Sequence, residues 1–437
     1  MLPILIQEDK YMSAFDRVIG YDSIKSELIQ ICDMIHNRRI YEDLGAKLPK
    51  GVLLYGDPGL GKTLMARSFI EEAGLPAYTL RRNKGGDAFV QTILDTFQKA
   101  KDNAPAIVFL DDMDKFANED EKHKDAEEYV AVQTGIDDVR ESDVFVIATA
   151  NEERKLPKSL TRSGRFDRKV EVFSPTTRDA QKIIEHYLSG KKVSEDVNME
   201  DLSMMMTYSS CAELETILNE ATIHAAYARR ESVAMEDLVH AVLRMQYESP
   251  DNFTRTADEK LAEISLHEAG HLVVCEVLCP GSVGLASVRA SGINSTGGFI
   301  HQCKDLTRRP YQILVSLAGK AAVEIYHAET CASGCQQDIN RAINDIRYAV
   351  SESGTCGFGM IDVESRYSPR MSESMNSRSE AVVYAELEKY YMKAKDILLK
   401  NKQFLEEITA ALLKKETLLY SDIQKIRENV TIMEVLV

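Results

Sequence analysis

Two histidines four residues apart carry the clearest chemistry in this chain, in the motif His267-Glu268-Ala269-Gly270-His271. On a helix, residues four apart lie on one face, so both imidazoles can bind the same zinc ion. Glu268 then lies beside the metal and can take a proton from an attacking water. Apolar residues across 261–274 predict a buried helix around the motif. The alternative is a core helix in which two histidines occur by chance.

A phosphate-binding loop near the start of the chain has a different chemistry. The loop is Gly56-Asp57-Pro58-Gly59-Leu60-Gly61-Lys62-Thr63, between an apolar strand at 51–55 and a helical pattern at 63–70. Its backbone N–H groups and the helix N-terminus can hold phosphates. Lys62 would reach the outer phosphates, and the Thr63 hydroxyl would bind Mg²⁺.

Polar residues follow two further apolar strands of the same region. Asp111 and Asp112 come directly after 106–110, and Asn151 follows the strand that begins at Val144. We expect Asp111 to hold Mg²⁺, Asp112 to orient the attacking water, and Asn151 to reach the γ-phosphate or that water.

Two arginines, Arg162 and Arg165, follow these strands. A guanidinium keeps its charge and fits phosphate oxygens, so either can act as a finger for a neighbouring subunit. Taken alone, each is more typical of a surface salt bridge.

The composition indicates a soluble globular protein. The 437 residues are 44% hydrophobic and 28% charged, which suggests about two or three domains. The net charge of −16 argues against a nucleic-acid partner. There is no apolar run long enough to span a bilayer and no secretory signal, so we expect no integral membrane segment.

The eight cysteines are scattered, which favours a reducing compartment and a cytoplasmic location. The pairs Cys275/Cys279 and Cys331/Cys335 have a spacing of four. They either form a second zinc site, bind the same ion as the histidines, or serve as small core residues.

Short apolar strands alternate with helical stretches in the first part of the chain, which predicts an α/β domain with a largely parallel sheet. The later residues have helical patterns. We therefore expect an α/β domain at 1–175, a helical subdomain at 176–250, and a mainly α-helical domain at 256–437. The strand candidates are 51–55, 76–80, 106–110, 144–149 and 169–173.

Together these motifs resemble a known family. Residues 16–245 resemble an AAA ATPase domain, and residues 258–430 resemble the peptidase of FtsH-type ATP-dependent zinc metalloproteases. The resemblance implies a P-loop AAA domain with a helical lid, followed by a mainly α-helical zinc metallopeptidase domain. It also implies ATP as the nucleotide and places Val18–Tyr21 at the adenine and Ser210–Leu214 at the start of the lid helix. The cofactor-binding residues that it implies are Ile19, Gly20, Asp57, Pro58, Gly59, Leu60, Gly61, Lys62, Thr63, Leu64, Asp111, Asn151 and Ala212.

The resemblance also supplies a third zinc ligand, which the spacing of the histidines does not. The segment Thr330–Asp338 matches the family segment that ends in an Asp ligand, so Asp338 would complete a site with His267 and His271 and leave a fourth position for water. Gly297-Gly298-Phe299 falls where the family has the edge strand that pairs with an extended substrate.

Three departures from the family stand out. The family's membrane-spanning N-terminal region is absent, which implies a soluble form. Asp112 stands where the family has Glu, so ATP hydrolysis could be slower. Residues 81–89 lack the usual pore loop, and Phe89 is either its substitute or a core residue.

The sequence therefore predicts an ATPase and zinc metalloendopeptidase that cuts protein substrates and forms a homo-oligomeric ring, a hexamer by resemblance. A rival is a remodelling ATPase or scaffold whose peptidase domain is zinc-stabilised but inactive. A third possibility is a peptidase that uses ATP only to assemble.

Overall fold

The computed structural model describes residues 13–82, 87–117, 126–162, 164–249, 258–289, 297–327, 335–351 and 373–435. The chain divides into two compact units: Met1–Gly190 with Tyr208–Thr216, and Lys191–Thr207 with Ile217–Val437. Helix α8 (Cys211–Tyr227) begins in the first unit and ends in the second. The three-part division at 1–175, 176–250 and 256–437 stays a prediction. Among the residues described, no helix is long and apolar enough to cross a membrane.

The first unit is built on a five-stranded parallel sheet in the order β2-β3-β4-β1-β5. Strands β3 and β4 are buried along their whole length, and apart from Asp111 and Thr149 their residues are apolar, as is typical of parallel strands covered on both faces. The predicted parallel sheet is therefore confirmed, and the ends of its strands differ from the predicted ones by at most two residues. The strands are β1 (Gly51–Tyr55), β2 (Ala77–Arg81), β3 (Ala106–Asp111), β4 (Val144–Ala150) and β5 (Arg168–Glu171).

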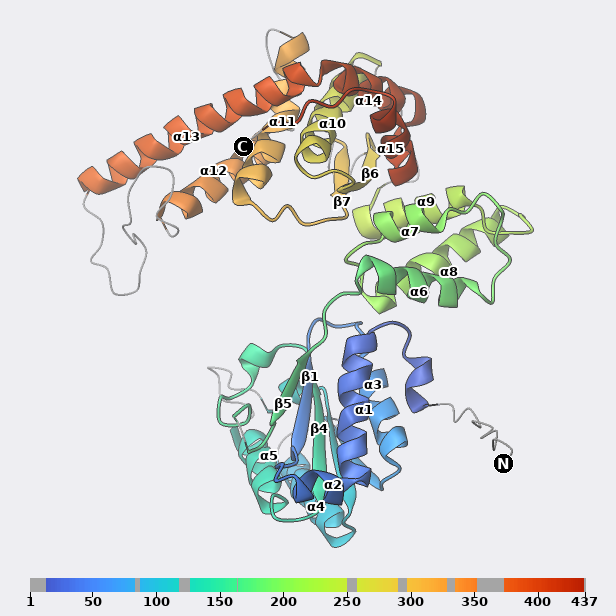
Figure 1. The fold of residues 1–437 in the computed structure, drawn as a ribbon, viewed down its shortest axis with the longest axis vertical. Helices are drawn as coiled ribbons and strands as arrows, with labels where there is room; N and C mark the ends of the chain where they lie inside the picture. The colour runs from blue at the N-terminus through green and yellow to red at the C-terminus, as the bar shows by residue number, and fades with distance from the viewer. Residues whose placement is uncertain are drawn as a thin grey trace, which may run out of the picture. The chain divides into compact units, whose positions relative to one another are not determined.

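Helices cover both faces of this sheet (Figure 1). The α-helices of the unit before α8 are α1 (Asp22–His36), α2 (Arg38–Asp43), α3 (Lys62–Ala73), α4 (Asp87–Asp102), α5 (Ala126–Asp138) and α6 (Thr177–Leu188). On one face α3 packs against β4 through Phe69 and Phe145, whose ring centroids are 5.3 Å apart. On the other, α4 and α5 approach closely, because a Cβ on Gly135 would stand 2.3 Å from the Phe97 ring. Since parallel strands end at the same edge, the residues after β1, β3 and β4 meet there.

The second unit is mainly helical and holds a small antiparallel sheet in the order β7-β6-β8. The strands are β6 (Val283–Ser287), β7 (Phe299–Gln302) and β8 (Thr417–Leu419). The helices besides α8 are α7 (Met199–Met205), α9 (Met235–Tyr247), α10 (Asp258–Leu278), α11 (Arg309–Tyr326), α12 (Cys335–Ser351), α13 (Glu373–Lys400), α14 (Lys402–Lys415) and α15 (Tyr420–Glu428).

Helices α10 and α11 pack closely at the centre of this second unit. A Cβ on Gly270 would stand 2.6 Å from the Ala318 carbonyl oxygen and 2.6 Å from the Ala322 Cβ, so only glycine allows this approach. Around the crossing lie fully buried Leu272 and Leu314. The close packing fixes one face of α10 against α11, and that face carries the two histidines of the motif.

Candidate functional site

The phosphate loop follows β1 and ends where α3 begins. Gly56, Gly59 and Gly61 have φ angles of 143°, 82° and 84°, which favour glycine. At Gly56 a Cβ would also stand 2.1 Å from the Val172 carbonyl oxygen. The Lys62 ammonium donates to the carbonyls of Gly56 and Asp57 at 2.7 and 2.6 Å, and burial lowers the pKa of Lys62. The lysine charge is thus held against the loop.

A hydrogen-bonded chain joins this loop to the end of β3. The hydroxyls of Thr63 and Thr149 both donate to Asp111 Oδ1, at 2.9 and 3.0 Å. The backbone N–H of Asp112 donates to Thr149 Oγ1 at 2.9 Å. Thr63 and Asp111, the predicted Mg²⁺ ligands, therefore lie side by side. A role for Thr149 was not predicted from the sequence, although Thr149 is the one hydroxyl-bearing residue at 144–150.

Asp112 lies at the end of the same strand in a left-handed conformation, with φ of 55°. Its Oδ2 accepts from Lys115 Nζ at 2.6 Å, and the Arg81 guanidinium is 3.9 Å away. The carboxylate is thus held by a cation on one oxygen. The other oxygen has no hydrogen-bond partner among the described residues, which leaves it able to accept from a water.

The predicted adenine segment and the start of α8 meet in this unit. The Ala212 N–H donates to the Gly59 carbonyl at 3.1 Å, which places the helix start on the phosphate loop. The Tyr21 hydroxyl lies 3.6 Å from Cys211 Sγ. A Cβ on Gly20, whose φ is 72°, would stand 3.0 Å from Asp179 of α6. Gly20 therefore lies in a segment that is packed against both α6 and α8.

The polar residues beyond β4 differ in their surroundings. Asn151 directly follows β4 and is partly buried. Arg165 is only 3% exposed, and it donates to both carboxylate oxygens of Asp137 at 2.9 and 2.6 Å and to the Ser159 carbonyl. Arg162 is exposed. Arg165 therefore forms an ion pair within its own chain, whereas the Arg162 side chain is open to solvent; the finger role of either stays a prediction.

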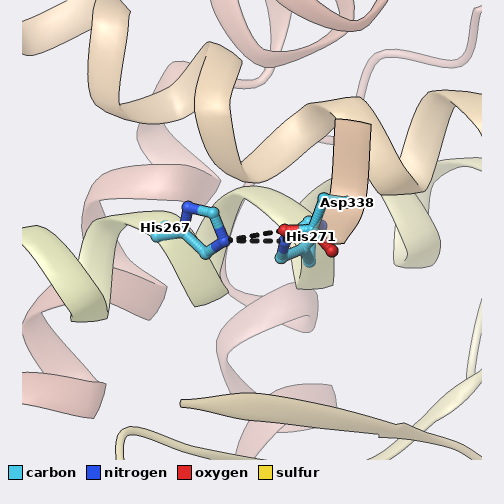
Figure 2. A group of neighbouring side chains, drawn as sticks. All are labelled: His267, His271 and Asp338. Carbon is cyan, nitrogen blue, oxygen red and sulfur yellow. Dashed lines mark hydrogen bonds and ion pairs between the residues drawn. The ribbon is translucent and has the colours of Figure 1, made fainter. Parts of the chain in front are cut away.

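In the second unit, His267 and His271 of α10 and Asp338 of α12 converge, and Figure 2 shows their polar atoms facing one another. The Asp338 Oδ2 atom lies 3.2 Å from His267 Nε2 and 3.3 Å from His271 Nε2. The two Nε2 atoms are 3.0 Å apart. His271 Nδ1 must donate to the Val315 carbonyl, 2.6 Å away, so the lone pair of its Nε2 faces the group.

Gly319 of α11 makes the space beside these rings. A Cβ there would stand 2.5 Å from His267 Cε1 and from His271 Nε2, and 2.6 Å from His267 Nε2. Two imidazole nitrogens and one carboxylate oxygen are a usual donor set for a catalytic zinc ion. The residues present therefore fit zinc. A role for Gly319 was not predicted. The one sequence signal was its position inside an apolar helical pattern, where a glycine can have a packing or functional reason.

Glu268 lies beside this group and is only 4% exposed. Its pKa is raised to about 7, mainly by burial; His271 opposes this shift and Asp338 adds to it. The backbone before β7 passes directly over this side chain, because a Cβ on Gly298 would stand 2.7 Å from Glu268 Cγ. Both the buried carboxyl and the edge of the small sheet are thus at the candidate metal centre.

The described cysteines of the two pairs, Cys275, Cys279 and Cys335, are not part of this three-residue group. Cys335 Sγ lies 3.9 Å from His267 Nδ1, which is the ring nitrogen turned away from Asp338. Cys275 is buried with its Sγ 3.1 Å from the Ser282 hydroxyl. In the described ranges, His267, His271 and Asp338 are the only group of three or more such side chains with metal-ligand geometry. Cys331 lies outside those ranges.

Phe89 is a core residue. Its side chain is 1% exposed and meets the Phe116 ring edge-on, with centroids 5.4 Å apart. The substitute pore aromatic is therefore not Phe89 in this conformation. Residues 83–86 of the same segment lie outside the described residues.

Comparison with known proteins agrees with this geometry. Residues 52–174 match the ATPase family associated with various cellular activities (AAA), and residues 254–426 match Peptidase family M41. ATP-dependent zinc metalloprotease FtsH 3 of Symbiobacterium thermophilum is 30% identical over 97% of this chain and 72% of its own length. FtsH 3 of Petrotoga mobilis is 30% identical, over 94% of this chain and 68% of its own length. FtsH of Leptotrichia buccalis is also 30% identical, over 94% of this chain and 56% of its own length.

The two matches occur in the order of the two sites described above. Identity of 30% extends across nearly the whole chain and across more than two thirds of two of these relatives. This chain therefore belongs to the FtsH-type family of AAA ATP-dependent zinc metalloproteases.

Proposed function

We propose that this chain is an ATP-dependent zinc metalloendopeptidase that acts on protein substrates as a ring, with six subunits as the expected number. The observation that carries the proposal is the convergence of His267, His271 and Asp338 around Gly319, beside the buried Glu268. The same chain has a complete phosphate loop hydrogen-bonded to Asp111 through Thr63. We also propose a cytoplasmic location, which the scattered cysteines support.

In the peptidase, His267, His271 and Asp338 would hold Zn²⁺, which when bound polarises water and the substrate carbonyl as a Lewis acid. Glu268 would take the proton of the attacking water and pass it to the leaving amine. The open edge of β7 would hold the substrate in extended form through backbone hydrogen bonds. Gly298 lets that edge approach Glu268, because any side chain there would occupy the space.

In the ATPase, the loop N–H groups and Lys62 would hold the phosphates of ATP, and Thr63 with Asp111 would hold Mg²⁺. Mg²⁺, when bound, neutralises charge that develops on the phosphates. Asp112 would orient the attacking water with the oxygen that Lys115 leaves open. Arg162 of one subunit would reach the γ-phosphate of the next, which makes hydrolysis depend on the ring.

The test is degradation of one folded and one permanently unfolded model substrate, each with ATP and with a non-hydrolysable analogue. We expect the folded substrate to be cut only with ATP. Cutting of the unfolded substrate with either nucleotide, and of the folded one with neither, would instead indicate that ATP serves only assembly. ATP hydrolysis without any cutting would support the remodelling ATPase or scaffold.

A further inference from the structure

The last residue of helix α9 holds the strand that passes the candidate metal centre. The Tyr247 ring stacks on Phe299, with centroids 3.9 Å apart and planes 19° from parallel. The Tyr247 hydroxyl lies 2.7 Å from His301 Nδ1, within hydrogen-bond distance. One tyrosine thus fixes the first and the third residue of β7.

Strand β7 has few other constraints in the described part of the chain. Among the described strands it pairs with β6 alone, from Phe299 opposite Ser287 to Gln302 opposite Val283, so it forms an edge of this three-stranded sheet. Gly298, directly before it, is the residue whose Cβ would meet Glu268. A small displacement of β7 would therefore change the position of a paired substrate relative to Glu268.

Helix α9 is in turn tied to the end of α8. Asp237 of α9 is fully buried and accepts from the Arg230 guanidinium. The same carboxylate lies 2.7 Å from His224 Nδ1 of α8. The rings of His224 and His240 stack with centroids 4.0 Å apart, which adds a second contact between the helices.

The other end of α8 lies on the phosphate loop. The N–H of Ala212, in its first turn, donates to the Gly59 carbonyl at 3.1 Å. The loop is packed closely against the helix start, because a Cβ on Gly59 would stand 3.0 Å from Ser210 Oγ and 3.1 Å from Ala212 Cβ. Since α8 is one continuous helix, it joins the loop that senses phosphates to the helix that ends in Tyr247.

We propose that Tyr247 is a positioning residue of the peptidase, which sets the place of the substrate-pairing strand β7 according to the nucleotide held by the phosphate loop. Helices α8 and α9 are the connecting elements. The inference rests on the proposed function, because it takes β7 as the strand that binds substrate. It adds a route by which ATP controls cleavage without any need for threading.

The experiment uses the full chain with zinc and a short unstructured peptide, whose cleavage requires no unfolding. KM and kcat are measured with ADP and with a non-hydrolysable ATP analogue for the parent, Tyr247→Ala and Tyr247→Phe. Tyr227→Ala is the control, because Tyr227 is 86% exposed at the end of α8. Zinc content and ATPase activity are measured for every variant.

We expect KM of the parent to differ at least about fivefold between the two nucleotides, the lower end of ordinary allosteric couplings. In Tyr247→Ala this difference should vanish and KM should rise about tenfold, because an aromatic pair and a hydrogen bond are lost. Tyr247→Phe keeps the stack and should show a smaller rise of KM. The control, and zinc content and ATPase throughout, should match the parent.

A second measurement needs neither cleavage nor nucleotide. Backbone amide exchange at residues 299–302 should be faster in Tyr247→Ala than in the parent and in the control. A parent without nucleotide-dependent KM, or a Tyr247→Ala variant that keeps the dependence, would overturn the inference. A parent that cuts no peptide would refute the proposed function, and unchanged exchange at β7 would then still refute the positioning role of Tyr247.

Discussion

Substituting Gly319 by alanine tests whether the metal centre depends on the absence of a side chain. The new Cβ would stand 2.5 Å from His267 Cε1 and His271 Nε2, about 1 Å closer than carbon contacts allow. A retreat of helix α11 would open its close packing against Gly270 of α10, where Ala318 and Ala322 now lie. The imidazoles must therefore move.

The size of the loss follows from how precisely zinc is held. Ligand distances in zinc sites vary by only about 0.2 Å, so a shift of several tenths of an ångström in both rings exceeds what the site tolerates. We expect the affinity for zinc to fall at least about 100-fold, the upper end for changes just outside a metal site. The fold should survive, because alanine is favoured over glycine inside a helix by about 1 kcal/mol.

The assay is zinc affinity by competition with a chromogenic chelator, together with peptide cleavage, ATPase activity and thermal unfolding. Gly190→Ala is the matched control, because a Cβ at that position meets nothing within 4 Å. Gly319→Ala should lose zinc and cleavage and keep ATPase activity. A Gly319→Ala protein that binds zinc within threefold of the parent affinity and cuts peptide normally would refute our account of the site.

Two further predictions concern the ATPase. Asp112→Asn should bind ATP like the parent and hydrolyse it at least about 100-fold more slowly, because an amide is a poor acceptor for the attacking water; equal turnover would remove that role from Asp112. Arg162→Ala and Lys62→Ala subunits should each be inactive alone and regain ATPase activity when mixed, because intact half-sites then meet between subunits. Full activity of a strictly monomeric protein would contradict shared sites.

Much of the α/β part could be predicted because its signals are local. Buried parallel strands are mostly apolar runs, and the loop from Gly56 to Thr63 has glycine wherever φ is positive. The positions of Asp111 and Asn151 followed from the shared edge of parallel strands. The surroundings of Arg165 could not be predicted, because its partner Asp137 belongs to another helix and nothing in the local sequence marks the pair.

The metal centre could likewise be predicted only in part from local sequence signals. The spacing of His267 and His271 follows from the helical repeat, whereas Asp338 comes from α12 and reaches the histidines only through tertiary packing. Its role was therefore implied by resemblance alone. Gly319 and Gly298 were missed because they act by leaving space, and the need for space depends on neighbours distant in the sequence.

We propose that one chain couples an ATPase to a peptidase whose general base is Glu268. The most direct test is a comparison of the parent with Glu268→Gln in one preparation series, measuring zinc per chain, ATP hydrolysis and cleavage of a folded substrate. We predict equal zinc and ATPase activity, and cleavage lower by at least about 10²–10⁴-fold, because the amide cannot accept the proton of the attacking water. Equal cleavage by the two proteins would show that Glu268 is not the general base.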